Sequence, residues 1–95
     1  MHVITRKRLR DFAARHPEAS EPLQSWYAIM SKSDFGTFAE IRRSFGTADK
    51  VGKFTVFDIG GNKYRLIAVI HCNRKKVYIR HVLAHAEYDR GKWKE

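Results

Sequence analysis

Apolar residues recur at helical spacing through the first half of the chain and predict helices there. The first helix is short and basic, carries Leu9 and Phe12, and ends at about His16 because Pro17 stops the pattern. The second helix begins at Ser20, a residue suited to the N-cap position. Its apolar stripe consists of Leu23, Trp26, Tyr27 and Met30.

Two shorter elements complete the first half. Thr37 followed by Glu40 matches a capping box and predicts a third helix that Gly46 closes. Residues 2–5 have the composition of a short first strand.

The second half alternates apolar and polar residues, which predicts an antiparallel meander. β-Branched and aromatic residues fill the segments 54–59, 63–70 and 77–84. The Gly60-Gly61-Asn62 sequence supplies the positive φ angles of a tight turn between the first two strands. A basic loop of six residues joins the second strand to the third, and a short turn ends the chain.

Helices first and strands afterwards predict an α+β fold, with N-terminal helices packed on one face of a small antiparallel sheet. A chain of 95 residues can bury one hydrophobic core, so we expect a single domain over residues 1–95. No repeat or low-complexity segment interrupts it.

The alternation also divides the strands into two faces, on the assumption that both hairpin loops are even in length. The face expected to receive the helices contains Phe57, Ile59, Tyr64, Leu66, Ala68, Ile70, Val77, Ile79, His81 and Leu83. The opposite face contains Phe54, Val56, Asp58, Lys63, Arg65, Ile67, Val69, Tyr78, Arg80, Val82 and Ala84.

On that opposite face Arg65 lies across from Val82 and diagonal to Arg80, about 7–8 Å apart along the backbones. Two neighbouring guanidinium groups repel each other unless an anion such as a phosphate lies between them, and their planar geometry suits phosphate oxygens. In the alternative interpretation each arginine pairs with Asp58 or Glu87 or extends into water. The alternation leaves both interpretations open.

The charge of the chain narrows the class of partner. Nineteen basic and ten acidic residues give a formal charge of +9, which favours nucleic acid first, then anionic lipid or an acidic protein. Residues 48–95 hold eleven of the basic and five of the acidic residues, so a polyanion is expected on the strand-rich half. The basic run Arg6-Lys7-Arg8-Arg10 is a solvated helix face or a contact for RNA or acidic protein segments.

Other classes of site are not expected. Cys72 is the single cysteine, so no intrachain disulfide can form. His81 and His85 on an extended strand would lie about 13 Å apart, too far to share a metal ion. The longest apolar stretch, Leu66 to Ile70, is too short for a membrane helix, and we expect a cytoplasmic protein.

Three segments of the second half carry a family resemblance. They are the run from Phe57 to Ile67, the tripeptide Tyr78-Ile79-Arg80, and the run His85-Ala86-Glu87-Tyr88-Asp89, followed by Trp93. In this order they resemble the HigB family of type II toxin-antitoxin toxins. The resemblance extends over most of the chain and is most specific in residues 53–93.

The resemblance implies a RelE-like fold and an endoribonuclease that cuts mRNA on the ribosome. The sequence offers no cluster of carboxylate or thiolate ligands, so we predict no metal or other cofactor. The resemblance also implies a HigA-type antitoxin with a helix-turn-helix domain, and contact with operator DNA only through that antitoxin. The alternative is a non-catalytic basic module that binds RNA or the ribosome.

Carried onto this sequence, the functional residues of the family are Lys53, Lys63, Arg65, Arg80, His85 and Tyr88. Cutting RNA without a metal requires a base, an acid and cations that stabilise the phosphorane. We expect Arg65 and Arg80 to supply the cations, and His85 to be the acid or base, with the neighbouring arginines favouring the base role. Tyr88 assists by stacking or proton donation. Lys53 and Lys63 hold flanking phosphates.

Two positions depart from the family pattern. Asp58 stands where asparagine is common, and Ala84 stands where threonine is common. A threonine at position 84 would form a capping box with Glu87, whereas alanine forgoes a bond worth about 1 kcal/mol. The terminal turn that carries His85 and Tyr88 is therefore expected to lack a side-chain cap.

Overall fold

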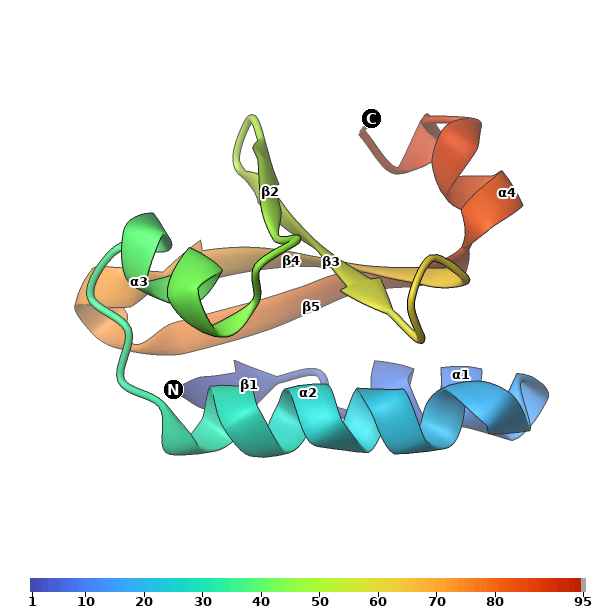
Figure 1. The fold of residues 1–95 in the computed structure, drawn as a ribbon, viewed down its shortest axis with the longest axis horizontal. Coiled ribbons are helices and arrows are strands. Elements are labelled where there is room, and N and C mark those ends of the chain that lie inside the picture. The colour runs from blue at the N-terminus through green and yellow to red at the C-terminus, as the bar shows by residue number, and fades with distance from the viewer. Residues whose placement is uncertain (95) are drawn as a thin grey trace.

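A five-stranded sheet runs through the centre of the computed structural model, which describes residues 1–94 (Figure 1). Its strands are β1 (His2–Ile4), β2 (Asp49–Val51), β3 (Phe54–Ile59), β4 (Tyr64–His71) and β5 (Lys76–Ala84). They lie in the order β1-β5-β4-β3-β2. All neighbours pair antiparallel except β1, which runs parallel to β5. The α+β prediction is confirmed, but the sheet is mixed rather than antiparallel, because the N-terminal strand joins its edge without a hairpin.

Four α-helices surround the sheet. They are α1 (Lys7–Arg15), α2 (Ser20–Lys32), α3 (Phe38–Ser44) and α4 (His85–Asp89). Three short 3₁₀ turns are η1 (Pro17–Ala19), η2 (Cys72–Arg74) and η3 (Lys92–Lys94). The predicted terminal turn is thus α4 together with η3.

One of the two helix N-caps predicted from the sequence is found in the structure. Thr37 is the N-cap of α3, and its hydroxyl accepts a hydrogen bond from the Glu40 amide at 3.2 Å. The Glu40 carboxylate reaches back to the Gly36 amide at 2.7 Å rather than to Thr37. Ser20 is not an N-cap. It lies inside the first turn of α2, because the 3₁₀ turn η1 leads directly into that helix.

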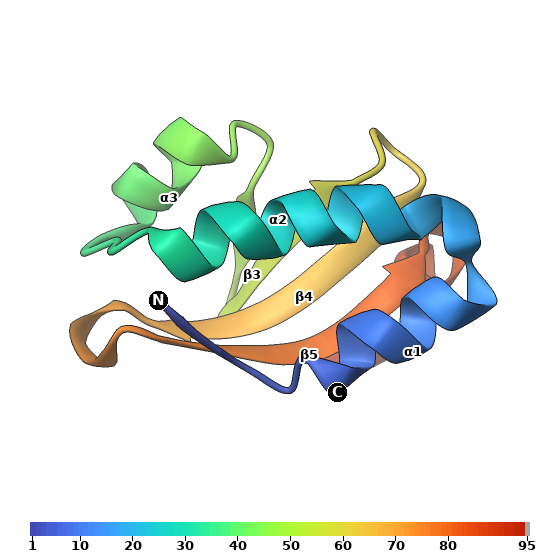
Figure 2. The ribbon, with the colours of Figure 1, turned by 90° about the horizontal axis from the view of Figure 1, so that it is seen from below.

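The helices α1 and α2 lie side by side beneath one face of the sheet, whereas α4 lies above the other face (Figures 1 and 2). The main core fills the space between α1, α2 and the sheet. Its most buried members include Phe12, Leu23, Trp26, Met30, Phe57, Leu66, Ala68, Val77 and Ile79. These strand residues belong to the face predicted to receive the helices, and Trp26 is a core residue as its stripe indicates.

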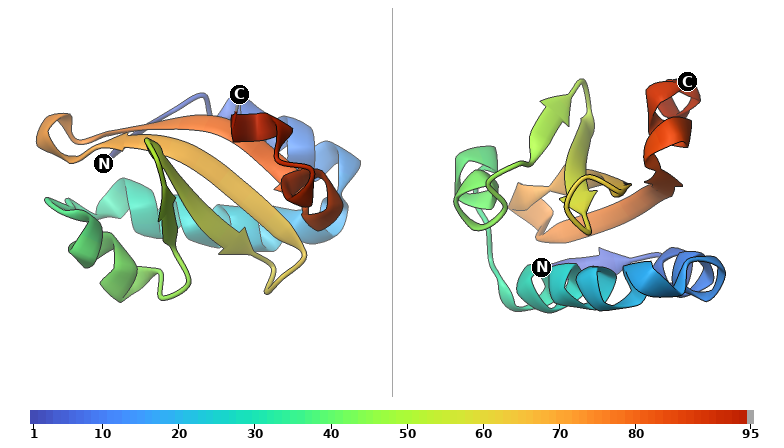
Figure 3. Two further views of the ribbon diagram at one scale, coloured as in Figure 1. Left: turned by 90° about the horizontal axis from the view of Figure 1, so that it is seen from above. Right: turned by 45° about the vertical axis from the view of Figure 1, so that its right-hand side comes forward.

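A second, smaller cluster occupies the opposite face. It consists of Phe54, Val56, Ile67 and Trp93, with Val51, Val69, Leu83 and Tyr88 packed around it. The C-terminal segment and the β2–β3 hairpin both rise from this face and stand opposite each other, so the face is cupped (Figure 3). The face predicted to carry cations is therefore partly a core of its own.

A β-bulge in β5 corrects the predicted register. Ala68 pairs with Ile79 and Ile67 pairs with His81, so Arg80 is an extra residue without a partner on β4. Arg65 consequently pairs with Leu83 and not with Val82.

The bulge reverses the faces of the residues that follow it. Val82 joins the main core, Leu83 packs against the second cluster, and His81 takes the diagonal position beside Arg65 that was predicted for Arg80. Both hairpin loops do have even lengths, with four residues each, so the reversal arises within the strand.

Candidate active site

Arg65 lies in the middle of the second face and is only 8% exposed. Its Nε lies 3.2 Å from the Asp58 carboxylate, directly across the β3–β4 ladder. One terminal nitrogen donates to the Tyr64 carbonyl at 3.1 Å, and the other donates to the Asn62 side chain in the turn. Pairing with Asp58, one of the two interpretations left open by the sequence, is confirmed for Arg65. A buried guanidinium held in this way is costly to unpair.

The C-terminal helix packs onto Arg65 through an aromatic ring. The Tyr88 ring lies 5.3 Å from the guanidinium carbon, within the range of a cation–π contact. Trp93 stacks nearly parallel to the Tyr88 ring at 5.2 Å, and its indole N–H donates to the Tyr88 carbonyl at 3.0 Å. Phe54 meets the edge of Trp93 at 5.6 Å. Arg65 and the second cluster thus fix Tyr88 between them.

The start of α4 is held by backbone contacts. The His85 amide donates to the Lys63 carbonyl at 3.0 Å, which ties the helix to the β3–β4 turn. The Glu87 carboxylate accepts from the Ala84 amide at 3.3 Å, while alanine provides no side-chain acceptor. The predicted absence of a side-chain cap is confirmed, but half of the capping box remains.

The two nitrogens of His85 have different surroundings. Nε2 lies 3.1 Å from the Asp89 carboxylate one turn along α4. Nδ1 is fully covered and has no hydrogen-bond partner within residues 1–94. The imidazole as a whole is 45% exposed and Asp89 is 60% exposed, so the pair lies at the surface.

Asp89 was missed by sequence reasoning. The signal that could have found it is the i, i+4 spacing of a histidine and a carboxylate, which places the two side chains on one side of a helical turn. A carboxylate in this position orients the imidazole and fixes which nitrogen carries the proton.

Residues 19–91 match the family described as HigB toxin, the RelE-like toxic component of a toxin-antitoxin system. The chain belongs to the HigB toxin family. The mRNA interferase HigB of Escherichia coli O6:H1 (strain CFT073) is 34% identical over 93 residues, which cover 95% of this chain and 90% of that protein. The mRNA interferase toxin HigB of Escherichia coli K12 is 34% identical over 92 residues, covering 94% and 88%. The resemblance stated from the sequence is confirmed, and this HigB-family toxin has an antitoxin as its partner.

The remaining residues expected to act in this HigB-family toxin are exposed cations. Lys63 directly precedes β4, and its backbone carbonyl accepts the hydrogen bond from the His85 amide. Lys53 lies in the β2–β3 turn, and its ammonium is 5.3 Å from the centre of the Phe54 ring. Arg80 lies on the bulge. The fold therefore gathers Lys63, Arg65, His85 and Tyr88 at one end of β4. Within residues 1–94, no hydrogen bond or ion pair joins Lys53 or Arg80 to these four.

A shallow hollow of about 220 Å³ adjoins this end of the sheet. It is lined by His81, Leu83, Glu87, Arg90, Lys92 and Trp93. Burial lowers the pKa of His81, and the nearby charges of Arg8 and Arg80 lower this pKa further. The imidazole beside the hollow is therefore less readily protonated than a free histidine, and the charged groups of the lining are Arg90, Lys92 and Glu87.

Within residues 1–94, no group of three or more histidine, cysteine or acidic side chains is arranged to hold a metal ion. None of the helices in this part of the chain has the length and apolar character needed to cross a membrane.

Proposed function

We propose that this HigB-family toxin is an mRNA interferase, a metal-independent endoribonuclease that cuts mRNA on the ribosome and so inhibits translation. The observation that supports this proposal most strongly is the position of His85 and Tyr88. Both lie on α4, where the Tyr88 ring packs on the Arg65 guanidinium and the His85 amide donates to the Lys63 carbonyl. These are side chains that can exchange protons and bind phosphate within one small region. The names of the two Escherichia coli relatives point to the same reaction.

In this proposal His85 exchanges the proton. Nε2 carries a proton while it donates to Asp89, and it can supply that proton to the departing 5′-oxygen. To remove the proton of the attacking 2′-hydroxyl instead, Nε2 must first lose its own proton, with Nδ1 carrying the ring proton once Asp89 has moved aside. Asp89 orients the ring in the free protein and moves aside when RNA enters. Tyr88 presents its hydroxyl to the reacting phosphate, because Arg65 and Trp93 already pack against its ring.

The cations divide into two roles. Arg80, Lys53 and Lys63 are exposed, and they hold the scissile and flanking phosphates. Arg65 is enclosed by Asp58, Asn62 and Tyr88, so it acts as a positioning residue that fixes the Tyr88 ring. This differs from the phosphate contact expected for Arg65 from the sequence.

The partners follow from the same proposal. The substrate is mRNA on the ribosome in the cytoplasm, and the antitoxin is of the HigA type with a helix-turn-helix domain. Operator DNA is contacted only through that antitoxin.

A translation extract tests the proposal. Purified protein should stop protein synthesis and leave discrete cuts in the message, and the cuts should disappear when ribosomes are omitted. His85→Ala should reduce the cleavage rate by at least about 100-fold, the usual contribution of a general acid or base. His71→Ala is the matched control, because His71 is exposed at the far end of β4, and it should cleave as the wild type does.

Intact mRNA with both the wild type and His85→Ala would refute the enzymatic proposal. If RNA binding were then salt-sensitive and unaffected by His85→Ala, the protein would be a non-catalytic basic module instead.

A further inference from the structure

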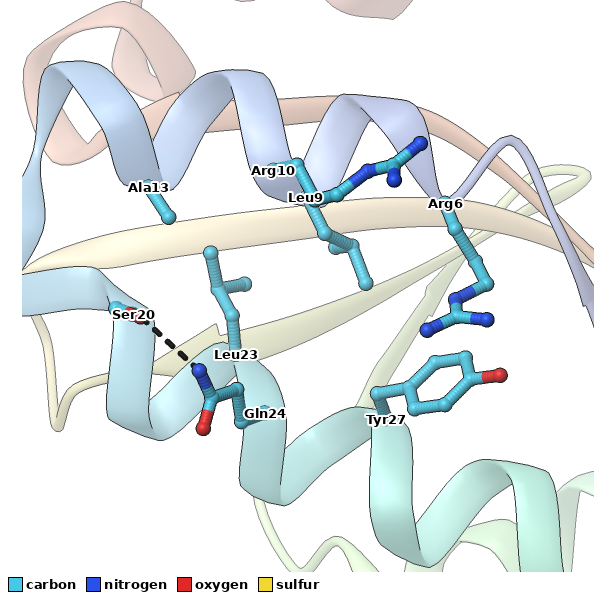
Figure 4. Close-up of a pocket in the computed structure, with 8 residues that line it drawn as sticks. All are labelled: Arg6, Leu9, Arg10, Ala13, Ser20, Leu23, Gln24 and Tyr27. Atoms are coloured by element: carbon cyan, nitrogen blue, oxygen red, sulfur yellow. Dashed lines mark hydrogen bonds between the residues drawn. The ribbon is translucent and has the colours of Figure 1, made fainter.

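A groove between α1 and α2 lies on the other side of the sheet from α4 (Figure 4). It is an open groove of about 350 Å³. It is lined by Arg6, Leu9, Arg10, Ala13, Ser20, Leu23, Gln24 and Tyr27. None of these residues belongs to the candidate active site, so the groove requires its own explanation.

The floor and the rim of the groove differ in chemistry. Leu9, Ala13 and Leu23 form an apolar floor between the two helices (Figure 4). Arg6 reaches across from the start of α1, and its guanidinium lies 4.2 Å from the centre of the Tyr27 ring on α2. Arg10 lies one turn further along the same rim. Such a surface suits a ligand that is apolar on one side and negatively charged on the other.

The two rim arginines are not neutralised within the protein. Among residues 1–94, no carboxylate lies within ion-pair distance of Arg6 or Arg10. The stack on Tyr27 uses the face of the Arg6 guanidinium and leaves its N–H edge available for a carboxylate. The groove is lined by two cations and no anion.

We propose that this groove docks an acidic amphipathic segment of the antitoxin, with apolar side chains on the floor and carboxylates against Arg6 and Arg10. RNA fits the surface less well, since the floor is formed by the apolar residues Leu9, Ala13 and Leu23 and one face of the Tyr27 ring is already covered by Arg6. A phosphate backbone would gain nothing from the apolar floor. The proposal rests on family membership and not on RNA cleavage.

Binding of the purified cognate antitoxin to the full-length toxin tests this proposal. All toxin variants carry His85→Ala, which lies across the sheet from the groove and permits production. The double substitution Arg6→Glu/Arg10→Glu should weaken antitoxin binding at least about tenfold, as expected when two charge pairs at an interface become repulsive. Lys7→Glu/Arg8→Glu makes the same charge change on α1 outside the groove and should alter binding by less than about threefold.

A third variant separates shape from charge. Ala13→Phe fills the groove at constant charge, and it should weaken binding both at low salt and at 0.5 M salt. The loss caused by Arg6→Glu/Arg10→Glu should shrink at high salt. Thermal unfolding of each variant confirms that the fold is retained.

Equal losses for the two charge-reversal pairs would overturn the proposal, because they would show general attraction without a docking site. Unchanged antitoxin binding by the groove variants would overturn it as well. If those variants bound ribosomes more weakly and the antitoxin normally, the occupant would be RNA. None of these outcomes depends on whether the protein cleaves mRNA.

Discussion

The two faces of the sheet are built in different ways. The face covered by α1 and α2 is largely apolar and holds the main core, with Thr55 and the Tyr64 hydroxyl among its polar groups. The face beneath α4 combines a four-residue apolar cluster with a buried arginine, its carboxylate partner and an aromatic stack. The first face stabilises the fold, and the second also positions the side chains proposed to act on RNA.

This difference has a physical consequence. Hydrophobic packing tolerates small shifts, whereas a buried guanidinium requires its partners at fixed positions. Tyr88 is held by Arg65 and Trp93, so the geometry of α4 depends on the buried guanidinium and its partners.

The largest effect on stability is expected from substitutions at two neighbouring residues of β4. Leu66 and Ile67 are both fully buried, but Leu66 points to the helices and Ile67 to the second cluster. Each substitution by alanine should lower the free energy of unfolding by about 2–5 kcal/mol, measured by urea denaturation. We expect Leu66→Ala at the upper end, since the short C-terminal segment over Ile67 can settle into the cavity.

The roles of the two faces are distinguished more clearly by the mRNA cleavage activity of Leu66→Ala and Ile67→Ala, measured under conditions in which both variants remain folded. Ile67→Ala should lose activity because α4 shifts, whereas Leu66→Ala should retain it. Retention by Ile67→Ala together with loss by Leu66→Ala would show that the division between the faces is wrong.

A smaller effect is expected at the ion pair on the second face. Asp58→Leu leaves the Arg65 guanidinium without its carboxylate and should lower the free energy of unfolding by about 2–3 kcal/mol. Asp58→Asn keeps an oxygen for the Nε–H and should cost less than about 1 kcal/mol. Trp93 fluorescence reports the accompanying movement of the aromatic stack. Equal costs for leucine and asparagine would mean that the pair does not hold Arg65.

The helix-covered face could be predicted well from the sequence and the second face only in part. Periodicity identified α1, α2 and the core residues of three strands, because a 3.6-residue or two-residue repeat is a local signal. The bulge at Arg80 has no such signal, since an extra residue in a strand leaves the composition unchanged. It moved His81 and Val82 to the faces opposite those predicted.

Long-range contacts account for the other differences. The parallel pairing of β1 with β5 and the closure of α4 over Arg65 join residues far apart in the chain. The family resemblance selected Arg65, His85 and Tyr88, but it did not show that Arg65 is enclosed or that Asp89 faces His85.

The smallest expected effect concerns His81, which lies on the second face only because of the bulge. Its pKa is lowered from 6.5 by burial and by the charges of Arg8 and Arg80, while Asp11, Glu87 and Arg90 line the hollows on either side of it. As the pH falls below 6.5, the unfolded chain takes up a proton that the folded protein resists. The stabilising contribution is therefore present above pH 6.5 and is lost as the pH falls towards the lowered value.

Denaturation at pH 7.5 and pH 5.2 measures this loss. The range between these two pH values lies above the titration of Glu18. The hydrogen bond from the Tyr64 hydroxyl lowers the pKa of Glu18 below 4.5, so the stability that Glu18 contributes is lost only in stronger acid. His81→Gln should lose less stability than the wild type between the two pH values, whereas His71→Gln, at an exposed position, should behave as the wild type does. An identical loss in all three proteins would mean that His81 is as well hydrated as an exposed histidine, and the bulge would then not have carried it into the second face.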